Sequence, residues 1–456
     1  MAVDQVYRYP APSRLALADG HADLRLATSG GSTAAGAAEH PHFFDGEVAH
    51  ADQTAVALLA VARVARTRFW TPPGMVAAAI RAADPVVTSD GRNLRFESFS
   101  VCCGVHARLD VLPGGLAAAA VTTGTTNVDV NPPLRAALAQ VARGDALRLA
   151  VGEELAVTTA AGTVVEERVP LPGRWLKGFA EVQVAGAGMA PVWEVGAAAA
   201  RAFVRGLPRG TTRVGTVLWA VPSLASVRLT SRPGNGAVAV VGADRLRVLE
   251  PLLRFATGLR TYAPAGAGAG RATAATWELA MPGARLVLTL SPDVGRGFSG
   301  EGGVLVDLAD PRTGDDADLV GAALAYEPRV DVLDLHRRTG LPHERVVRAL
   351  TRLGAAGRVG YDAHAGAFFH RELPYDPAAL DALHPRLLDA RALVDAGAVS
   401  PADDRGVHRV RSGDVEHGVR LRPDGDRCTC PWYGRHGDDR GPCKHVLAAR
   451  LLADRA

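Results

Sequence analysis

The sequence contains few cysteines, no long hydrophobic run and no recognisable targeting segment. Five cysteines in 456 residues are too few for a disulfide-rich scaffold. No stretch reaches the roughly 18 apolar residues that span a bilayer, and Met1–Tyr9 lacks the charged and apolar regions of a secretory signal. We therefore expect a cytoplasmic protein with free thiols and without a membrane partner.

The composition also excludes a strongly basic or acidic protein. Lysine occurs only at Lys177 and Lys444, so nearly all positive charge is arginine, and the formal net charge is only +3. The whole molecule is therefore not an electrostatic nucleic-acid binder. An apolar content of 48% and a charged content of 22% are typical of a globular protein, and this length predicts two to four domains.

Residue types that bind metals are concentrated near the end of the chain. Cys428 and Cys430 form one pair at i,i+2, and Cys443 and His445 form a second pair after twelve intervening residues. Three thiolates and one imidazole suit tetrahedral Zn²⁺, and four protein ligands leave no open position for water. The pattern predicts a structural zinc site and no catalytic metal.

These residues also carry a family resemblance. The segments Cys428–Pro431 and Pro442–His445 resemble a SWIM zinc finger, whose pattern is CxC, a variable gap and CxH. The resemblance extends to His408–Arg411 and Gly418–Leu421, where the family places two short strands. It implies a ββα zinc finger, which we assign to residues 405–456.

More distant segments resemble bacterial proteins of the same kind. Leu94–Leu109 and Pro172–Glu181 are similar to stretches of arginine- and alanine-rich actinobacterial SWIM zinc-finger family proteins. The family resemblance implies binding to DNA or to protein without choosing between them. Because such proteins are often encoded beside MoxR-type ATPases and VWA proteins, it also implies an alternative role as an adaptor subunit of a MoxR-type ATPase/VWA assembly, without nucleic-acid binding.

Within the zinc finger, the two ligand pairs are expected at the end of a hairpin and in the first turn of a helix over Cys443–Ala453. Arg427, Lys444 and the positive helix N-terminus would favour the thiolates. His436 is either a competing ligand or an exposed loop residue. Trp432 and Tyr433 either form the core of the module or are exposed for stacking and protein contacts.

The rest of the chain predicts an α+β protein. Residues 1–92 are expected as an N-terminal loop and helical region, with a buried helix over 52–65 and a second helix after Pro72–Pro73. Residues 93–310 alternate apolar and polar positions and predict a β-rich body. Segments 93–185 and 212–308 show a similar order of strands and helices, and Arg108–Leu109 in the first corresponds to Arg228–Leu229 in the second. This recurrence favours a two-fold repeat, although short matches also arise by chance.

A loop over Asp310–Asp318 is taken as a boundary, and residues 319–373 predict a winged-helix-like domain. One helix over Val330–Thr339 ends at Gly340, a second spans His343–Leu353, and a hairpin follows. Residues 374–398 then predict a helical connector to the zinc finger.

The second of these helices carries a row of arginines. Arg345, Arg348 and Arg352 lie at i, i+3 and i+7, on a different face from the apolar residues. In a DNA-binding module this row, together with Lys444, would contact DNA. The alternative is a solvated face on a domain that contacts protein.

No motif of a common enzyme class is present: the sequence contains no P-loop, no GxSxG and no HExxH. We therefore expect no catalytic residues and no small-molecule substrate, although a cleft that gathered Asp129, His106 and Glu181 would reopen the question. Cys102 and Cys103 are interpreted as small core residues. The sequence predicts a non-enzymatic protein that uses zinc to organise a module for binding DNA or a protein.

Overall fold

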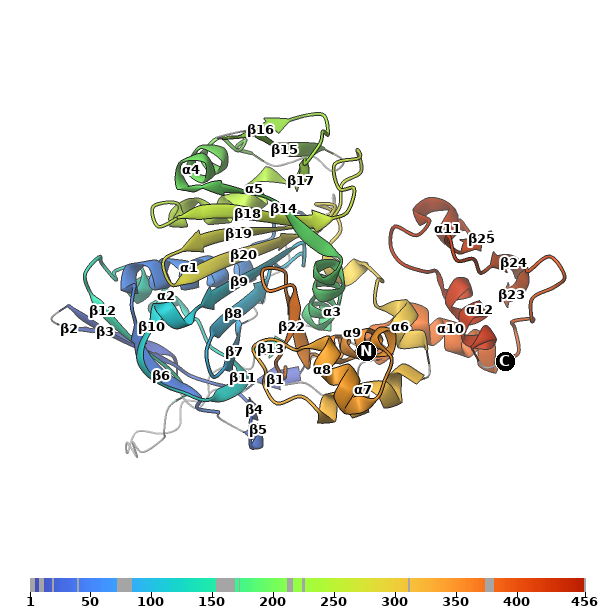
Figure 1. Ribbon diagram of the computed structural model, residues 1–456, viewed down its shortest axis with the longest axis horizontal. Coiled ribbons are helices and arrows are strands. Elements are labelled where there is room, and N and C mark those ends of the chain that lie inside the picture. Colours follow the sequence, from blue (N-terminus) through green and yellow to red (C-terminus); the bar gives the residue numbers. More distant parts are fainter. Residues whose placement is uncertain are drawn as a thin grey trace.

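The computed structural model describes residues 5–7, 12–18, 20–38, 41–71, 84–152, 169–171, 173–210, 216–223, 226–310, 312–373 and 381–454. A ten-stranded sheet connects the two halves of the body (Figure 1). Its strands follow the order β14 (Met189–Gly196), β18 (Gly258–Pro264), β19 (Ala275–Met281), β20 (Ala284–Leu290), β9 (Val105–Val111), β8 (Leu94–Phe99), β7 (Val86–Asp90), β11 (Thr123–Asn127), β4 (Gly31–Thr33) and β5 (Gly36–Ala38).

Smaller sheets flank this one. A five-stranded sheet has the order β10 (Leu116–Val121), β6 (Phe44–Val48), β12 (Ala146–Val151), β3 (His21–Leu26) and β2 (Arg14–Ala18). A three-stranded sheet has the order β16 (Ser226–Thr230), β15 (Val217–Ser223) and β17 (Val238–Val241). A short pair joins β1 (Gln5–Tyr7) to β13 (Val169–Leu171).

The N-terminal segment differs from the prediction of a loop and helical region. Strands β2 to β6 all precede helix α1 (Ala51–Arg66) and are part of the two large sheets. These strands are short, and β3 pairs in parallel with β12, which lies far along the chain. Because the pairing is non-local and the strands are short, the local pattern of apolar residues carries little signal for them.

The main core lies between the sheets and helix α1. This is the buried helix that the sequence predicted, and its alanines allow close packing against β8 and β9. The helix predicted after Pro72–Pro73 lies outside the described residues. The remaining helical elements of the body are η1 (Pro113–Gly115), α2 (Pro132–Leu138), α3 (Gly173–Ala187), α4 (Ala197–Arg205), α5 (Ala243–Leu246), η2 (Arg247–Leu252) and η3 (Phe298–Gly300).

The two halves of the body meet where β9 pairs with β20, from Val105–Leu290 to Val111–Ala284. The residues that the sequence aligned as a repeat occupy unlike places in this arrangement. Arg108 lies in a central strand of the ten-stranded sheet, whereas Arg228 lies in an edge strand of the three-stranded sheet. The structure therefore does not confirm that alignment as a duplication.

The predicted helix–helix–hairpin segment is present in that order. It comprises α8 (Val332–Thr339), α9 (His343–Ala355), β21 (Val359–Asp362) and β22 (Ala367–His370). Gly340 ends α8 with a φ of 71°, as the sequence predicted, because a glycine adopts this left-handed conformation without strain.

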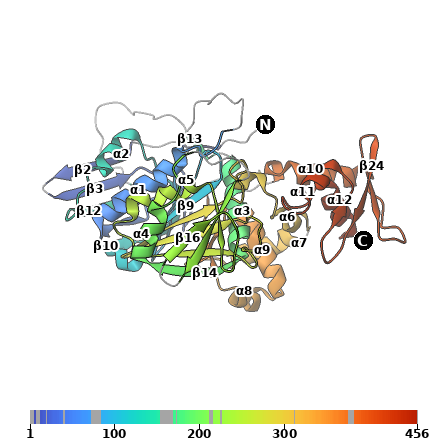
Figure 2. The same ribbon diagram turned by 90° about the horizontal axis from the view of Figure 1, so that it is seen from above.

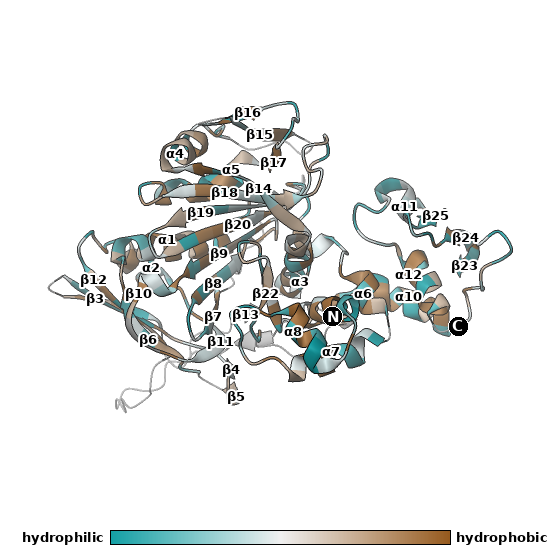
Figure 3. Cartoon of the chain, viewed as in Figure 1, coloured by the Kyte–Doolittle hydropathy of each residue, from teal (hydrophilic) through white to brown (hydrophobic). Residues whose placement is uncertain are grey.

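The prediction of a boundary loop over Asp310–Asp318 is wrong. It forms helix α7 (Arg312–Ala322), which packs against α9 and is mostly hydrophilic in Figure 3. Its Asp316 pairs with Arg345, and Asp310 just before it pairs with Arg348. Both partners lie on α9, a different helix, and cannot be recognised from the local sequence. The aspartates and their sequence neighbours alone therefore predict a solvated loop.

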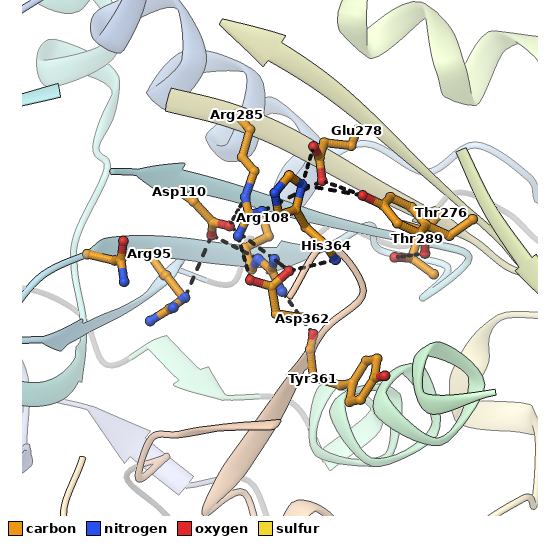
Figure 4. A network of polar contacts seen from close by, with 12 residues as sticks. Arg95, Arg108, Asp110, Thr276, Glu278, Arg285, Thr289, Tyr361, Asp362 and His364 are labelled. Carbon is orange, nitrogen blue, oxygen red and sulfur yellow. Dashed lines mark hydrogen bonds and ion pairs between the residues drawn. The ribbon is translucent and has the colours of Figure 1, made fainter. Parts of the chain in front are cut away.

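The hairpin docks on the polar face of the ten-stranded sheet. Asp362 at the end of β21 contacts Arg108 of β9, with Oδ1 and Nη2 3.0 Å apart, and also Arg285 of β20 (Figure 4). His364 in the turn contacts Glu278 of β19 at 2.8 Å. The carboxylate of Asp110 bonds both arginines from within the sheet. Charged residues of the strands are therefore buried under the hairpin and paired there.

The C-terminal part extends from the rest of the molecule along its long axis (Figure 1, Figure 2). It contains η5 (Asp381–Leu383), α10 (Pro385–Asp395), β23 (His408–Ser412), β24 (Val415–Arg420), β25 (Arg427–Cys428), α11 (Pro431–His436) and α12 (Lys444–Ala453). A separate core joins α12 to α10 and to α6 (Leu305–Ala309). None of the described helices combines the length and hydrophobicity that a membrane span requires.

Candidate metal centre

The four candidate metal ligands lie on three adjoining elements. Cys428 ends β25, Cys430 is the N-cap of α11, Cys443 is the N-cap of α12, and His445 follows in the first turn of α12. The hairpin and the C-terminal helix are those predicted, but α11 was not. A run from Pro431 to His436 is too short to show helical periodicity.

These side chains lie close enough together to hold one metal ion. One ligand atom from each residue lies within 4.8 Å of the others, and Nδ1 of His445 is 3.8 Å from Sγ of Cys428. Around a zinc ion with bonds of about 2.3 Å to sulfur and 2.0 Å to nitrogen, neighbouring ligand atoms are about 3.5–3.8 Å apart. The four residues are at most 8% exposed, so the site is closed to solvent.

Backbone N–H groups already face the sulfur atoms. The amide of Tyr433 donates to Sγ of Cys430 at 3.3 Å, and the amide of Val446 donates to Sγ of Cys443 at 3.5 Å. Cys430 and Cys443 thus each cap a helix N-terminus, where the helix dipole favours an anion. The thiol of Cys428 donates to Cys443 and, with His445 and the Val446 amide, lowers the pKa of Cys443 to about 4. The site therefore favours a thiolate at Cys443.

The surroundings fit a structural metal. Nδ1 of His445 faces Sγ of Cys428 and is the nitrogen placed to bind a metal, and the ring of His417 lies 4.3 Å from the ring of His445. His436 is not part of the ligand cluster. Tyr433 is half-buried and donates its hydroxyl to the carbonyl of Asp426. The residues present suit Zn²⁺ held by four protein atoms, which leaves no position for a substrate.

The zinc finger is attached to the body by two arginines that sequence reasoning missed. Arg386 at the start of α10 donates to the carbonyls of Arg440 and Pro442 in the zinc loop and to Glu301 in the body, at 2.6–3.1 Å. Arg440 in turn donates to the carbonyl of Gly300 at 2.8 Å. Single arginines with backbone acceptors carry no motif, so nothing in the sequence distinguishes them from the other arginines.

Replacing Gly441 with alanine should loosen this attachment without removing the metal. Gly441 has a φ of +68°, and a Cβ at this position would lie 2.1 Å from the carbonyl oxygen of Gly302. The two backbones must separate, at a cost of about 1–3 kcal/mol. Hydrogen exchange should therefore accelerate at 299–303 and 440–442 while the zinc content stays unchanged.

The matched control is Gly434→Ala. Gly434 lies in helix α11 of the same module, and a Cβ there meets nothing within 4 Å. Its exchange pattern should equal that of the wild type. Equal exchange in the Gly441→Ala variant would contradict a close backbone contact between the zinc finger and the body.

The arginine row that was considered for DNA contacts lies on α9, and two of its members have acidic partners. Arg345 binds Asp316 through two hydrogen bonds, and Arg348 lies 3.3 Å from Asp310. Arg352 is half-buried. On the zinc finger, Nζ of Lys444 lies 3.5 Å from a carboxylate oxygen of Asp389 on α10. These four residues therefore do not form one surface of uncompensated charge.

The residues that would have reopened the question of catalysis have separate partners. His106 contacts Glu97, Asp129 bonds Asn131 and Ser13, and Glu181 accepts the amide of Gly303. Among these described residues no contact joins the three. The thiol of Cys103 is buried, and burial raises its pKa to about 12, which does not suit a nucleophile.

The site and its supporting elements define a zinc-finger module: a three-stranded sheet and a helix joined by four closely spaced Cys and His donors. Residues 415–451 match the model of the SWIM zinc finger family, and this span contains all four donors. The match covers under a tenth of the chain.

Comparisons of the whole chain are less specific. No curated protein matches it significantly. Among solved structures, it is similar to the proliferating cellular nuclear antigen of Entamoeba histolytica, with 9% sequence identity and a TM-score of 0.34. That similarity covers 55% of this chain and 99% of the other. A likeness at this TM-score carries no statement about function.

Proposed function

We propose that this chain is a non-enzymatic interaction protein in which zinc organises a C-terminal module that binds a protein partner. The observation that carries the proposal is the closed donor set of Cys428, Cys430, Cys443 and His445, because four protein ligands stabilise a fold and leave no position for chemistry. The SWIM match favours an interaction role, with DNA or with protein.

The packing of the winged-helix-like segment favours a protein partner over DNA. A recognition helix must be free to enter the major groove, and its hairpin must be free to contact the backbone. Here α9 packs against α7 and α3, and Arg345 and Arg348 near its N-terminal end are already paired with Asp316 and Asp310. The hairpin is docked on the body through Asp362. We therefore propose that this segment links the body to the zinc finger. An adaptor in a MoxR-type ATPase/VWA assembly is one form of this function.

Duplex DNA binding by the full zinc-loaded chain tests the choice of partner. We expect only non-specific binding at physiological salt, with a Kd of roughly 10⁻⁴ M or weaker. The triple variant Arg345→Ala, Arg348→Ala, Arg352→Ala should bind DNA as weakly as the wild type. Tight, salt-dependent binding that this variant loses would overturn the proposal in favour of DNA.

Co-purification after nuclease treatment tests the protein interaction itself. A protein retained by the wild type should be lost from the Cys443→Ala variant, whose module has no metal. His436→Ala is the control, because His436 lies in the same loop outside the ligand cluster. A partner retained equally by all three proteins would place the interaction elsewhere in the chain.

A further inference from the structure

A cavity of about 230 Å³ lies at the junction between the body and the zinc finger. We call it the junction cavity. The body contributes Lys177 and Glu181 of α3 and residues 299–301 at the end of η3, whereas the C-terminal part contributes Arg386 of α10, Trp432 of α11 and Arg440. Its residues thus come from segments that are far apart in the sequence. The cavity is separate from the zinc ligands, none of which lines it.

The two arginines of the cavity bond to neutral acceptors. The hydrogen bonds of Arg386 go to three carbonyl oxygens, and those of Arg440 go to a fourth. Arg386 also stacks over Trp432, with the guanidinium 5.0 Å from the ring centroid. In the described structure neither guanidinium lies within ion-pair distance of a carboxylate. A guanidinium has five N–H donors, so among the described residues both arginines keep N–H groups without a protein acceptor, and their positive charges are not neutralised by direct contact.

The two acids of the cavity do not neutralise this positive charge. Glu301 contacts Arg296, which lies outside the lining. Glu181 is 5% exposed and accepts the amide of Gly303 at 2.9 Å. Burial raises the pKa of Glu181 to about 8, so this carboxyl is mostly protonated at neutral pH and offers a donor. Burial lowers the pKa of Lys177, and the nearby charge of Arg386 lowers it further.

We propose that the junction cavity binds a small oxyanion, a phosphate or a carboxylate group, held by Lys177, Arg386 and Arg440. Charge-assisted donors of this kind are the usual ligands of phosphate and carboxylate. The volume is below the roughly 300–1,000 Å³ of sites for drug-sized ligands. It therefore fits inorganic phosphate, a small phosphate ester, or one acidic group of a partner peptide. Because both parts of the chain contribute donors, the bound anion would fix the zinc finger against the body.

Calorimetric titration of the full zinc-loaded chain with inorganic phosphate tests the proposal, and a short acidic peptide with a free carboxyl terminus forms the second arm. Binding of phosphate alone indicates a small-molecule source, binding of the peptide alone indicates a partner's carboxylate, and either supports the site. Lys177→Ala should weaken binding at least about tenfold, whereas Lys177→Arg should keep it. Arg435→Ala, which removes an exposed arginine outside the lining, should have no effect.

The pH dependence separates this site from binding to a general positive surface. The titratable and charged groups that line the cavity are Lys177, Glu181, Glu301, His384, Arg386 and Arg440. As the pH rises through about 8, Glu181 ionises and repels the anion, so the affinity of the wild type should fall. Glu181→Gln keeps a neutral donor and should lose this part of the pH dependence.

Two results would overturn the proposal: no heat with either probe, or equal affinity of the wild type and Lys177→Ala. Zinc content and thermal unfolding of each variant show whether it is folded, and Lys177→Arg provides a variant with the charge retained. Because the titration uses the purified chain without a partner, its failure would leave the proposed interaction function untouched.

Discussion

Replacing Cys443 with alanine is expected to abolish zinc binding and to unfold the C-terminal module. Cys443 is both a ligand and the N-cap of α12, so the substitution removes one of the four donors and the first hydrogen bond of the helix. In small zinc modules the free energy of metal binding, about 10–16 kcal/mol, is also the free energy of folding. Metal analysis should show a fall from about one equivalent to none.

The unfolding should stop at the ten-stranded sheet. The core around the zinc site includes residues of α6, α10 and α12, whereas the core of the body is a separate set of residues. Hydrogen exchange should therefore rise across residues 385–454 and remain slow in β9 and β20. His436→Ala should keep the metal and the wild-type exchange pattern. Retained zinc in the Cys443→Ala variant, or loss of protection throughout the body, would contradict this expectation.

The zinc site was predictable because its four ligands lie close together in the sequence. The two i,i+2 pairs of donors are separated only by a short loop, and the metal requires only that they converge. The helices α8 and α9 were predictable for the same reason, since each combines apolar periodicity with an end signal such as Gly340. Their orientation on the body was not, because it depends on Asp362 reaching strands that are distant in the sequence.

The polar face of the sheet shows why contacts between distant segments cannot be predicted from the sequence. Arg95, Arg108 and Asp110 alternate with apolar residues in β8 and β9, and alternation of this kind is typical of a strand with one face in water. In the structure these residues are at most 3% exposed, because the hairpin covers them: the Phe369 ring lies under the guanidiniums of Arg95 and Arg108, and Asp362 contacts Arg108. Burial of charged residues requires partners from distant segments. Those partners, such as Asp362, are visible only once the chain is folded.

Replacing Asp362 with asparagine should destabilise the chain more than any surface substitution. The carboxylate of Asp362 contacts both Arg108 and Arg285, which are at most 6% exposed. Asparagine has nearly the same shape but no charge, so Arg108 would keep Asp110 as its close carboxylate partner, and Arg285 would keep Asp110 and the more distant Glu278. Removal of one member of a buried ion pair costs about 3–5 kcal/mol. Denaturant unfolding should show a loss of this size, and exchange should accelerate first in β21 and β22.

A surface ion pair provides the control for this substitution. Asp334 contacts Arg337 and Arg338 on α8, and all three side chains are at least 43% exposed. Solvent screens such pairs, so Asp334→Asn should change the free energy of unfolding by less than about 1 kcal/mol. Equal losses in the two variants would show that the hairpin is not held by its buried charges.

The effect of Asp362→Asn should also depend on pH with a defined sign. Burial raises the pKa of Asp362, but the guanidiniums of Arg108, Arg285 and Arg95 together hold it well below its ordinary value of 3.8. A carboxyl with a lowered pKa in the folded state stabilises the fold above its ordinary pKa, and this contribution is lost as the pH falls below that value. The difference in unfolding free energy between the wild type and Asp362→Asn should therefore be largest near neutral pH and shrink below pH 3.8. A difference that stays constant, or grows in acid, would mean that the ionised carboxylate is not what holds the hairpin to the sheet.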